Sequence, residues 1–227
     1  MDLKKEAAAK AVSMIKDKSI VGLGAGRTIA HAIEFLKKNI ENGLNIQVVT
    51  SSFTTNQLLL KNKLPVLQLS SLNKIDIYFD GCDQVDKKLN ALKSGGGIHT
   101  HEKLLASMSD EFILMGDETK LVDNLDSRFP LVIEILPEAE VFAATKIQML
   151  FQGVKAEFRI NDKREGPVLT ENGNYLLDIW FDKWPDLAII NPVLKTITGV
   201  VETSLFYMMA NKAIIANAKE VEVLERS

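Results

Sequence analysis

The stretch SIVGLGAGRTIAHAIEFLKKNIEN (residues 19–42) decides the fold class. It begins as a short apolar run, passes through three glycines, and then repeats apolar residues at helical intervals. A buried strand, a glycine turn and an amphipathic helix in this order are typical of a parallel sheet covered by helices. The N–H groups and the helix dipole at such a turn favour an anion such as phosphate, and a tight turn without a ligand is the alternative.

Strands and helices alternate on both sides of this stretch. A helix is expected over residues 3–15, where apolar residues recur at helical intervals. Further on we expect strands at NIQVVT (45–50), VLQL (66–69), IDIYFD (75–80) and FILMGD (112–117), and helices at TTNQLLLKNKL (54–64) and EKLLASMSDEF (102–112). The alternation through about residue 125 predicts a Rossmann-like, mostly parallel sheet.

The order of elements changes at RFPLVIEILPEAE (128–140). Strands are expected at 131–136, 155–160, 171–181 and 199–206, helices at 139–152 and 191–198, and a polar turn at 161–167. This βαββαβ order is the ferredoxin-like arrangement. The tail KAIIANAKEVEVLERS (212–227) offers one or two strands that return to the first sheet. We therefore predict an α/β protein in which an inserted α+β domain (128–205) interrupts a Rossmann-like domain formed by 1–127 and about 206–227.

Composition and charge limit the classes of function. A chain of 227 residues with 46% hydrophobic and 25% charged residues is typical of a globular protein. A formal charge of -3 gives no broad cationic surface, which argues against nucleic acid or an anionic membrane as the main partner. A single cysteine, Cys82, forms no intramolecular disulfide, and the first residues lack the apolar block of a signal peptide. A cytoplasmic protein is expected.

The glycine turn does not match a dinucleotide site. Arg27 stands where the third fingerprint glycine would be, and the second strand ends in Thr50, Ser51 and Ser52 instead of an acid that binds ribose. NAD is therefore disfavoured. Arg27 and the hydroxyl of Thr28 suit a phosphate group instead.

A second cluster of polar residues follows the strand at 75–80. Asp80 and Asp83 come at its carboxyl end, where ligands bind in open parallel sheets. The segment LKSGGG (92–97) combines Lys93 with glycine amides suited to an oxyanion, and Glu102 begins the next helix where a general base would be within reach. The alternatives are a helix cap or solvated turn for the acids and a flexible hinge for the glycines.

Other polar residues give weaker signals. Lys120 follows the strand at 112–117 and would reach the same edge of the sheet. His99 and His101 form an H-x-H pair without a matched second pair, so we expect no metal site. Cys82 is expected to be a small, half-buried residue and not a thiolate catalyst.

In order along the chain, these motifs resemble the ribose-5-phosphate isomerase type A family, and the resemblance covers nearly the whole chain. The motifs that carry it are GLGAGRT (22–28), DGCDQ (80–84), KSGGG (93–97), THEK (100–103), DETK (117–120), TENGN (170–174) and GVVETSLF (199–206).

The resemblance implies interconversion of D-ribose 5-phosphate and D-ribulose 5-phosphate in the non-oxidative branch of the pentose phosphate pathway, without metal or organic cofactor. It implies that Glu102 moves a proton between C2 and C1 through a cis-enediolate, that Asp80 and Asp83 assist ring opening and proton movement between oxygens, and that Lys93 and the glycine amides stabilise negative charge. It also implies a homodimer or homotetramer. The implied substrate-binding residues are Lys4, Ala25, Gly26, Arg27, Thr28, Asp80, Gly81, Cys82, Asp83, Lys93, Ser94, Gly95, Gly96 and Lys120.

The chain departs from the family pattern at four positions. Arg27 replaces a serine and either strengthens phosphate binding or narrows substrate choice, and Gln84 replaces a glutamate beside Asp83, which removes one charge. His101 replaces an arginine, and Ser94 separates the lysine from its glycines. A sugar-phosphate sensor and an isomerase acting on another phosphosugar are the alternatives. We favour the isomerase, because a sensor of the related type would carry a DNA-reading module before the first strand.

Overall fold

The computed structural model describes residues 2–161 and 165–226, and it is built around a six-stranded sheet. The strand order is β14-β13-β6-β3-β1-β2, and neighbouring strands are parallel except for the antiparallel edge strand β14. The strands are β1 (Ile20–Leu23), β2 (Gln47–Thr50), β3 (Ile75–Asp80), β6 (Ser109–Asp117), β13 (Lys212–Ala216) and β14 (Val221–Glu225). The predicted return of the tail to the first sheet is therefore confirmed.

Helices cover both faces of this sheet. Helices α1 (Leu3–Val12), α2 (Arg27–Glu41) and α3 (Phe53–Lys61) contribute to one apolar core, and α4 (His99–Met108) contributes to the core on the other face. Helix α2 presents its apolar residues at helical spacing and buries Ile29, Ala32, Ile33 and Leu36. This packing fixes the start of α2 against the end of β1.

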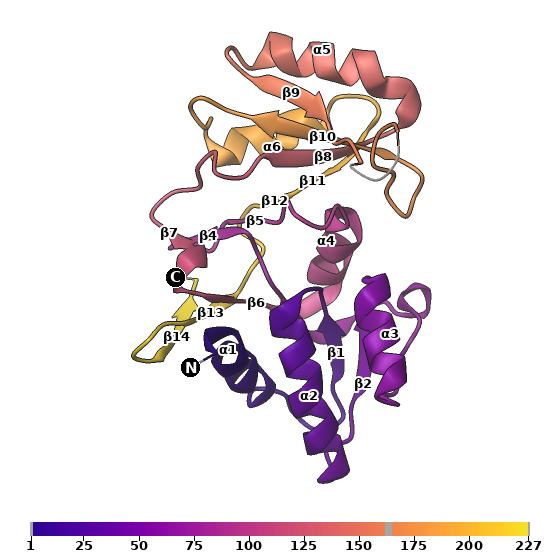
Figure 1. The fold of residues 1–227 in the computed structure, drawn as a ribbon, viewed down its shortest axis with the longest axis vertical. Helices are drawn as coiled ribbons and strands as arrows, with labels where there is room; N and C mark the ends of the chain where they lie inside the picture. Colours follow the sequence, from indigo (N-terminus) through magenta and orange to yellow (C-terminus); the bar gives the residue numbers. More distant parts are fainter. Residues whose placement is uncertain (1, 162–164, 227) are drawn as a thin grey trace.

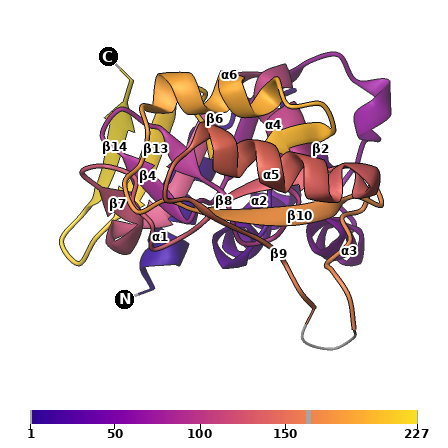
Figure 2. The same ribbon diagram turned by 90° about the horizontal axis from the view of Figure 1, so that it is seen from above.

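A second, antiparallel sheet lies beside the first, in the order β11-β8-β10-β9. Its strands are β8 (Leu131–Ile135), β9 (Lys155–Phe158), β10 (Tyr175–Trp180) and β11 (Val200–Thr203). Helices α5 (Glu140–Leu150) and α6 (Leu187–Lys195) cover the side that faces away from the six-stranded sheet (Figures 1 and 2). The βαββαβ order and this strand order confirm the ferredoxin-like arrangement.

A third small sheet connects the two larger ones and was not predicted. Its order is β12-β5-β4-β7, and it comprises β4 (Gln84–Asp86), β5 (Ala91–Leu92), β7 (Leu121–Val122) and β12 (Leu205–Phe206). We call the six-stranded sheet with its helices the first lobe and the antiparallel sheet with α5 and α6 the second lobe. Figure 1 shows the small sheet between these two lobes, next to α4. These pieces are two or three residues long, too short to give a periodic signal.

Several predicted elements differ from the structure. Residues 66–69 do not form a strand: Val66 makes one isolated bridge to Val48, and the 3-10 turn η1 (Leu69–Ser71) follows. The helix predicted over 102–112 ends at Met108, because the chain turns extended at Ser109 and continues as β6. The strand predicted at 199–206 divides between β11 and β12, which belong to different sheets. The polar turn predicted at 161–167 lies partly outside the described residues.

Two further 3-10 turns of the described residues are η2 (Glu118–Lys120) and η3 (Pro137–Ala139).

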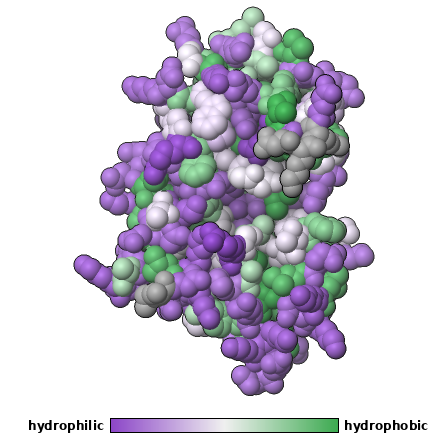
Figure 3. Space-filling model, viewed as in Figure 1, coloured by the Kyte–Doolittle hydropathy of each residue, from purple (hydrophilic) through white to green (hydrophobic). Residues whose placement is uncertain are grey.

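The face in Figure 3 is mostly hydrophilic, with apolar side chains gathered over α3, where Phe53 and Leu60 are exposed. Within residues 2–161 and 165–226, every helix is too short or too polar to cross a bilayer.

Candidate active site

A cavity of about 400 Å³ lies at the carboxyl ends of β1, β3 and β6. This is where ligands bind in open parallel sheets. Every predicted site residue except Ser94 lines it. The lining residues are Lys4, Ala25, Gly26, Arg27, Thr28, Asp80, Gly81, Cys82, Asp83, Lys93, Gly95, Gly96, Ile98, Glu102, Met115, Gly116, Asp117 and Lys120.

Three charged side chains meet at the bottom of the cavity. The ammonium of Lys93 lies 2.9 Å from Oδ2 of Asp80 and 3.3 Å from Oε1 of Glu102, and it donates to the carbonyl of Gly81 at 2.6 Å. The side chains of all three charged residues are at most 7% exposed. A cation therefore lies between two buried carboxylates that come from different elements, β3 and α4.

Asp80 is held by several donors. Its Oδ1 accepts from the amides of Gly81 at 2.8 Å and Ala25 at 3.2 Å, and its Oδ2 accepts from the hydroxyl of Tyr78. Gly24 makes room for it, because a Cβ at that position would lie 1.9 Å from the carboxylate. Asp80 is thus fixed in one orientation and joins the glycine turn after β1 to β3.

The charges shift one another's protonation. Burial, together with the nearby Asp80 carboxylate, raises the pKa of Glu102 to about 8, although Lys93 opposes the shift. Burial alone would lower the pKa of Lys93, but the two carboxylates outweigh it and raise that pKa above its usual value. The site therefore contains a permanent cation and a carboxyl group that can take up and release a proton near neutral pH.

The glycine turn after β1, which also lines the cavity, suits a phosphate group. Gly26 has a φ of +99°, and helix α2 begins there without a side-chain cap, so the first amides of the helix are open to an anion. Arg27 is exposed at this turn, and Lys4 and Lys120 line the same cavity. The start of a helix and three cationic side chains thus line one cavity, together with Asp117, whose Oδ2 lies 3.9 Å from the ammonium of Lys4.

The glycine run is used differently from the prediction. The amides of Ser94 and Gly95 donate to Oδ2 of Asp83 at 2.6 and 2.9 Å, so Asp83 occupies one of the three glycine amides expected to bind an oxyanion, that of Gly95. The hydroxyl of Ser94 donates to the buried carbonyl of Pro130 at 2.5 Å, which turns this side chain away from the cavity. Arg159 of the second lobe donates to the carbonyl of Gly95 at 3.1 Å. The loop is therefore braced, and the hinge alternative is disfavoured.

Several departures from the family pattern lie outside the cavity. Gln84 exchanges two hydrogen bonds with Asp126, at 2.5 and 3.0 Å, and so does not contact the acids of the site. His101 faces Glu171 at 3.8 Å.

The H-x-H pair is part of helix α4 and not of a loop, and burial lowers the pKa of His99 to about 4. Burial raises the pKa of the Cys82 thiol to about 12, which disfavours a thiolate.

A metal site is not evident in the part of the chain that the structure describes: no group of three or more His, Cys, Asp or Glu residues there is arranged to hold an ion. The charge between Asp80 and Glu102 is supplied by Lys93.

Some cavity residues were missed from the sequence. Ile98, Met115, Gly116 and Asp117 line the cavity because they flank α4 and end β6. Tyr78, which donates to Asp80, carried a usable signal: residues i and i+2 of a strand point to the same face.

Comparisons with known proteins agree on one family. A family model described as ribose 5-phosphate isomerase A (phosphoriboisomerase A) matches residues 47–220. A ribose-5-phosphate isomerase A from Thermosynechococcus vestitus is 37% identical over 215 residues, which cover 94% of this chain and 90% of that protein. One from Pyrococcus furiosus is 37% identical over 227 residues, which cover 99% and 98%.

Solved structures give the same result. The structure of ribose 5-phosphate isomerase A from Methanocaldococcus jannaschii superposes with a TM-score of 0.92 at 33% identity, covering 99% of this chain and 98% of that one. A D-ribose-5-phosphate isomerase in complex with phospho-erythronic acid superposes with a TM-score of 0.92 at 35% identity, with the same coverage.

Proposed function

Because the chain belongs to the ribose 5-phosphate isomerase A family, we propose that it uses Glu102 to interconvert D-ribose 5-phosphate and D-ribulose 5-phosphate. The chain is an aldose-ketose isomerase. The observation that carries the assignment of Glu102 is its position 3.3 Å from the ammonium of Lys93, inside the cavity at the carboxyl end of β3.

In the proposed mechanism the open-chain aldose lies with C1 and C2 beside the carboxyl group of Glu102. The carboxylate of Glu102 takes the proton from C2, the C2–H electrons form the C1–C2 double bond, and the carbonyl electrons move to O1. The ammonium of Lys93 stabilises the negative charge of the resulting cis-enediolate. A proton passes from O2 to O1, and Glu102 returns its proton to C1, which gives the ketose.

Asp80 and Asp83 have distinct proposed roles. Asp80 reaches the same ammonium as Glu102 and is fixed by backbone amides, which suits it to ring opening and to proton transfer between O1 and O2. Asp83 lines the cavity, but one of its oxygens holds the amides of Ser94 and Gly95. We assign Asp83 mainly to shaping the glycine loop.

The substrate's phosphate is placed at the start of α2. This placement is supported by the first amides of that helix, which no side chain caps, and by Arg27, Lys4 and Lys120, which line the cavity. Anchoring the phosphate there leaves the carbonyl end of a five-carbon chain to reach Glu102. Binding energy from the phosphate then orients the reacting carbons.

Exposed apolar side chains on α5 support the proposal that the chain works as a homodimer or homotetramer. Val141, Phe142 and Met149 are 75%, 48% and 71% exposed. Light scattering of the purified protein tests this, and a monomer at micromolar concentration contradicts it.

The test of the function is incubation of purified, EDTA-treated protein with ribose 5-phosphate while ketose formation is followed. We expect ribulose 5-phosphate to form, and arabinose 5-phosphate, which has the opposite configuration at C2, to bind and inhibit without comparable turnover. Binding of ribose 5-phosphate without any ketose would instead establish a sensor. Faster turnover of another phosphosugar would establish altered specificity.

A further inference from the structure

Residues 203–205 cross from the second lobe to the small third sheet. They accept hydrogen bonds from two lysines near Glu102, namely Lys93 and Lys103. The carbonyls of Thr203 and Leu205 accept from the ammonium of Lys103 at 2.5 and 2.9 Å. The carbonyl of Ser204, between them, accepts from the backbone amide of Lys93 at 3.0 Å. Successive carbonyls of an extended chain point to opposite sides, so one short segment bonds to two different elements.

Lys103 is an unusual residue for this position because its charge is buried. Its side chain is 9% exposed, and its ammonium lies 3.0 Å from Oε1 of Glu202 and 5.0 Å from the centre of the Phe206 ring. Burial lowers the pKa of Lys103 to about 8. Burying an ammonium costs free energy unless it is well bonded. Glu202 does not require it, since Lys195 contacts the other carboxylate oxygen at 2.5 Å.

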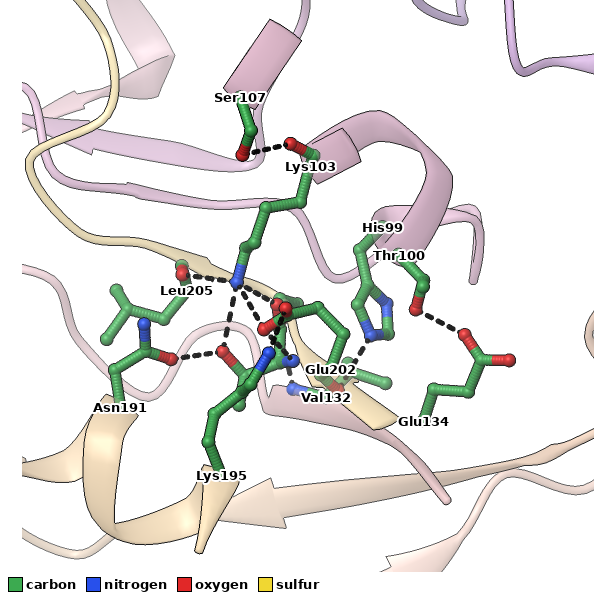
Figure 4. A network of polar contacts seen from close by, with 12 residues as sticks. His99, Thr100, Lys103, Ser107, Val132, Glu134, Asn191, Lys195, Glu202 and Leu205 are labelled. Atoms are coloured by element: carbon green, nitrogen blue, oxygen red, sulfur yellow. Dashed lines mark hydrogen bonds and ion pairs between the residues drawn. The ribbon is translucent and has the colours of Figure 1, made fainter. Parts of the chain in front are cut away.

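Helix α4, which carries the proposed base, depends on such contacts at its start. Its N-cap residue Ile98 makes no side-chain cap hydrogen bond. Instead, His99 Nε2 lies 3.2 Å from the carbonyl of Glu202, and the hydroxyl of Thr100 donates to Glu134 of β8. Figure 4 shows these contacts and those of Lys103 running from one turn of α4 into the second lobe. Tertiary contacts thus replace the missing local cap.

We propose that Lys103 is a positioning residue for the isomerisation: its ammonium fixes the N-terminal half of α4 to residues 203–205 and so sets the distance between Glu102 and Lys93. Glu102 and Lys103 are adjacent in α4 but point to different sides of it, one to the cavity and one to residues 203–205. Because the carbonyl of Ser204 also accepts from the backbone amide of Lys93, a single segment positions both Glu102 and Lys93. This proposal rests on the proposed function.

The proposal gives a role to the TENGN (170–174) and GVVETSLF (199–206) motifs, which contribute no side chain to the cavity. Both support helix α4. Glu134 receives hydrogen bonds from Thr170 at 2.8 Å, Asn172 at 3.0 Å and Asn174 at 2.8 Å, and so holds Thr100 against a rigid partner. The second motif supplies residues 203–205. Both segments of the second lobe therefore support the helix that carries the base.

The experiment compares Lys103→Met with Lys195→Met, which removes the same charge from the same carboxylate but does not touch α4. Kinetics with ribose 5-phosphate are measured alongside affinities for phospho-erythronic acid and inorganic phosphate. For Lys103→Met we expect kcat to fall about 10- to 100-fold with KM within about threefold, since a displacement near 1 Å costs about this much. Affinity for phospho-erythronic acid falls, and affinity for inorganic phosphate and the kinetics of Lys195→Met stay near wild type.

If the variants fold, three kinetic results would overturn the proposal: equal losses in the two variants, a kcat of Lys103→Met within threefold of wild type, or a loss expressed in KM instead of kcat. If Lys103→Met does not fold, Lys103→Gln, which retains N–H donors without the charge, replaces it. Failure of both to fold also overturns the proposal, because Lys103 would then be a requirement of the fold itself. An inactive wild type would refute the proposed function, whereas an active wild type with two equally impaired variants would refute only the role of Lys103.

Discussion

Replacing Glu102 by glutamine removes one titratable carboxyl group from a buried cluster while keeping the shape of the side chain. The carboxylate is 3.3 Å from the ammonium of Lys93, and Lys93 keeps its second partner Asp80 at 2.9 Å after the change. Little rearrangement is therefore expected. The variant loses only the group that takes the proton from C2.

The expected loss follows from the lack of a substitute base. General base catalysis typically contributes about 10²- to 10⁴-fold. Asp80 cannot take over, because Ala25, Gly81 and Tyr78 hold its carboxylate in place. We therefore expect the upper part of this range, a fall in kcat of about 10³- to 10⁴-fold, or about 4–5 kcal/mol of activation free energy. KM should stay within about threefold, since the phosphate end of the cavity is unchanged.

The assay is initial-rate ketose formation from ribose 5-phosphate, with Glu41→Gln, an exposed position at the end of α2, as the matched control. Binding of inorganic phosphate shows whether the Glu102→Gln protein is intact. A kcat within tenfold of wild type in an intact variant would refute the assignment of Glu102 as the base. A large rise in KM with kcat unchanged would show that Glu102 binds substrate and does not transfer the proton.

Three further predictions concern the wild-type pH profile and two single variants. Because burial raises the pKa of Glu102 to about 8 and the base acts as the carboxylate, kcat/KM should rise roughly tenfold from pH 6 to pH 7 and level off above about pH 8; a profile flat across this range would contradict the assignment. Arg27→Ser should raise KM for ribose 5-phosphate about three- to tenfold with kcat little changed, and a gain of a different phosphosugar would show instead that Arg27 sets specificity. Ser94→Ala should lower the free energy of unfolding by about 1–2 kcal/mol in a denaturant titration, because the buried carbonyl of Pro130 loses its donor. If Ser94→Ala instead raised KM more than Arg27→Ser does, Ser94 would be a substrate-binding residue.

The long periodic elements could be predicted from the sequence, and the short ones could not. Residues 19–42 gave β1, the glycine turn and α2, because burial along a strand and along one helical face leaves a pattern in the sequence. The strands β4, β5, β7 and β12 are two or three residues long, too short for a periodic pattern, and β7 and β12 join the sheet from distant parts of the chain. The end of α4 at Met108 was missed because apolar residues continue at similar spacing into β6.

The cavity residues were predictable from the carboxyl ends of strands, but their mutual contacts were not. Asp80 and Glu102 lie in different elements, and only packing places Lys93 between them. The amides of the glycines after Lys93 were expected to face the substrate, yet Asp83 accepts from that of Gly95, because side-chain direction in a loop has no periodicity to reveal it. The role of Lys103 was hidden for the same reason, since its partners are about a hundred residues away.

The most direct test of proton transfer by Glu102 is isotope exchange in deuterated water, followed by NMR at C2 of ribose 5-phosphate and C1 of ribulose 5-phosphate. Wild-type protein should introduce deuterium at these carbons, and Glu102→Gln should do so at least about 10³-fold more slowly while still binding phospho-erythronic acid. Exchange at the wild-type rate in Glu102→Gln would contradict the account, because another group would then be moving the proton.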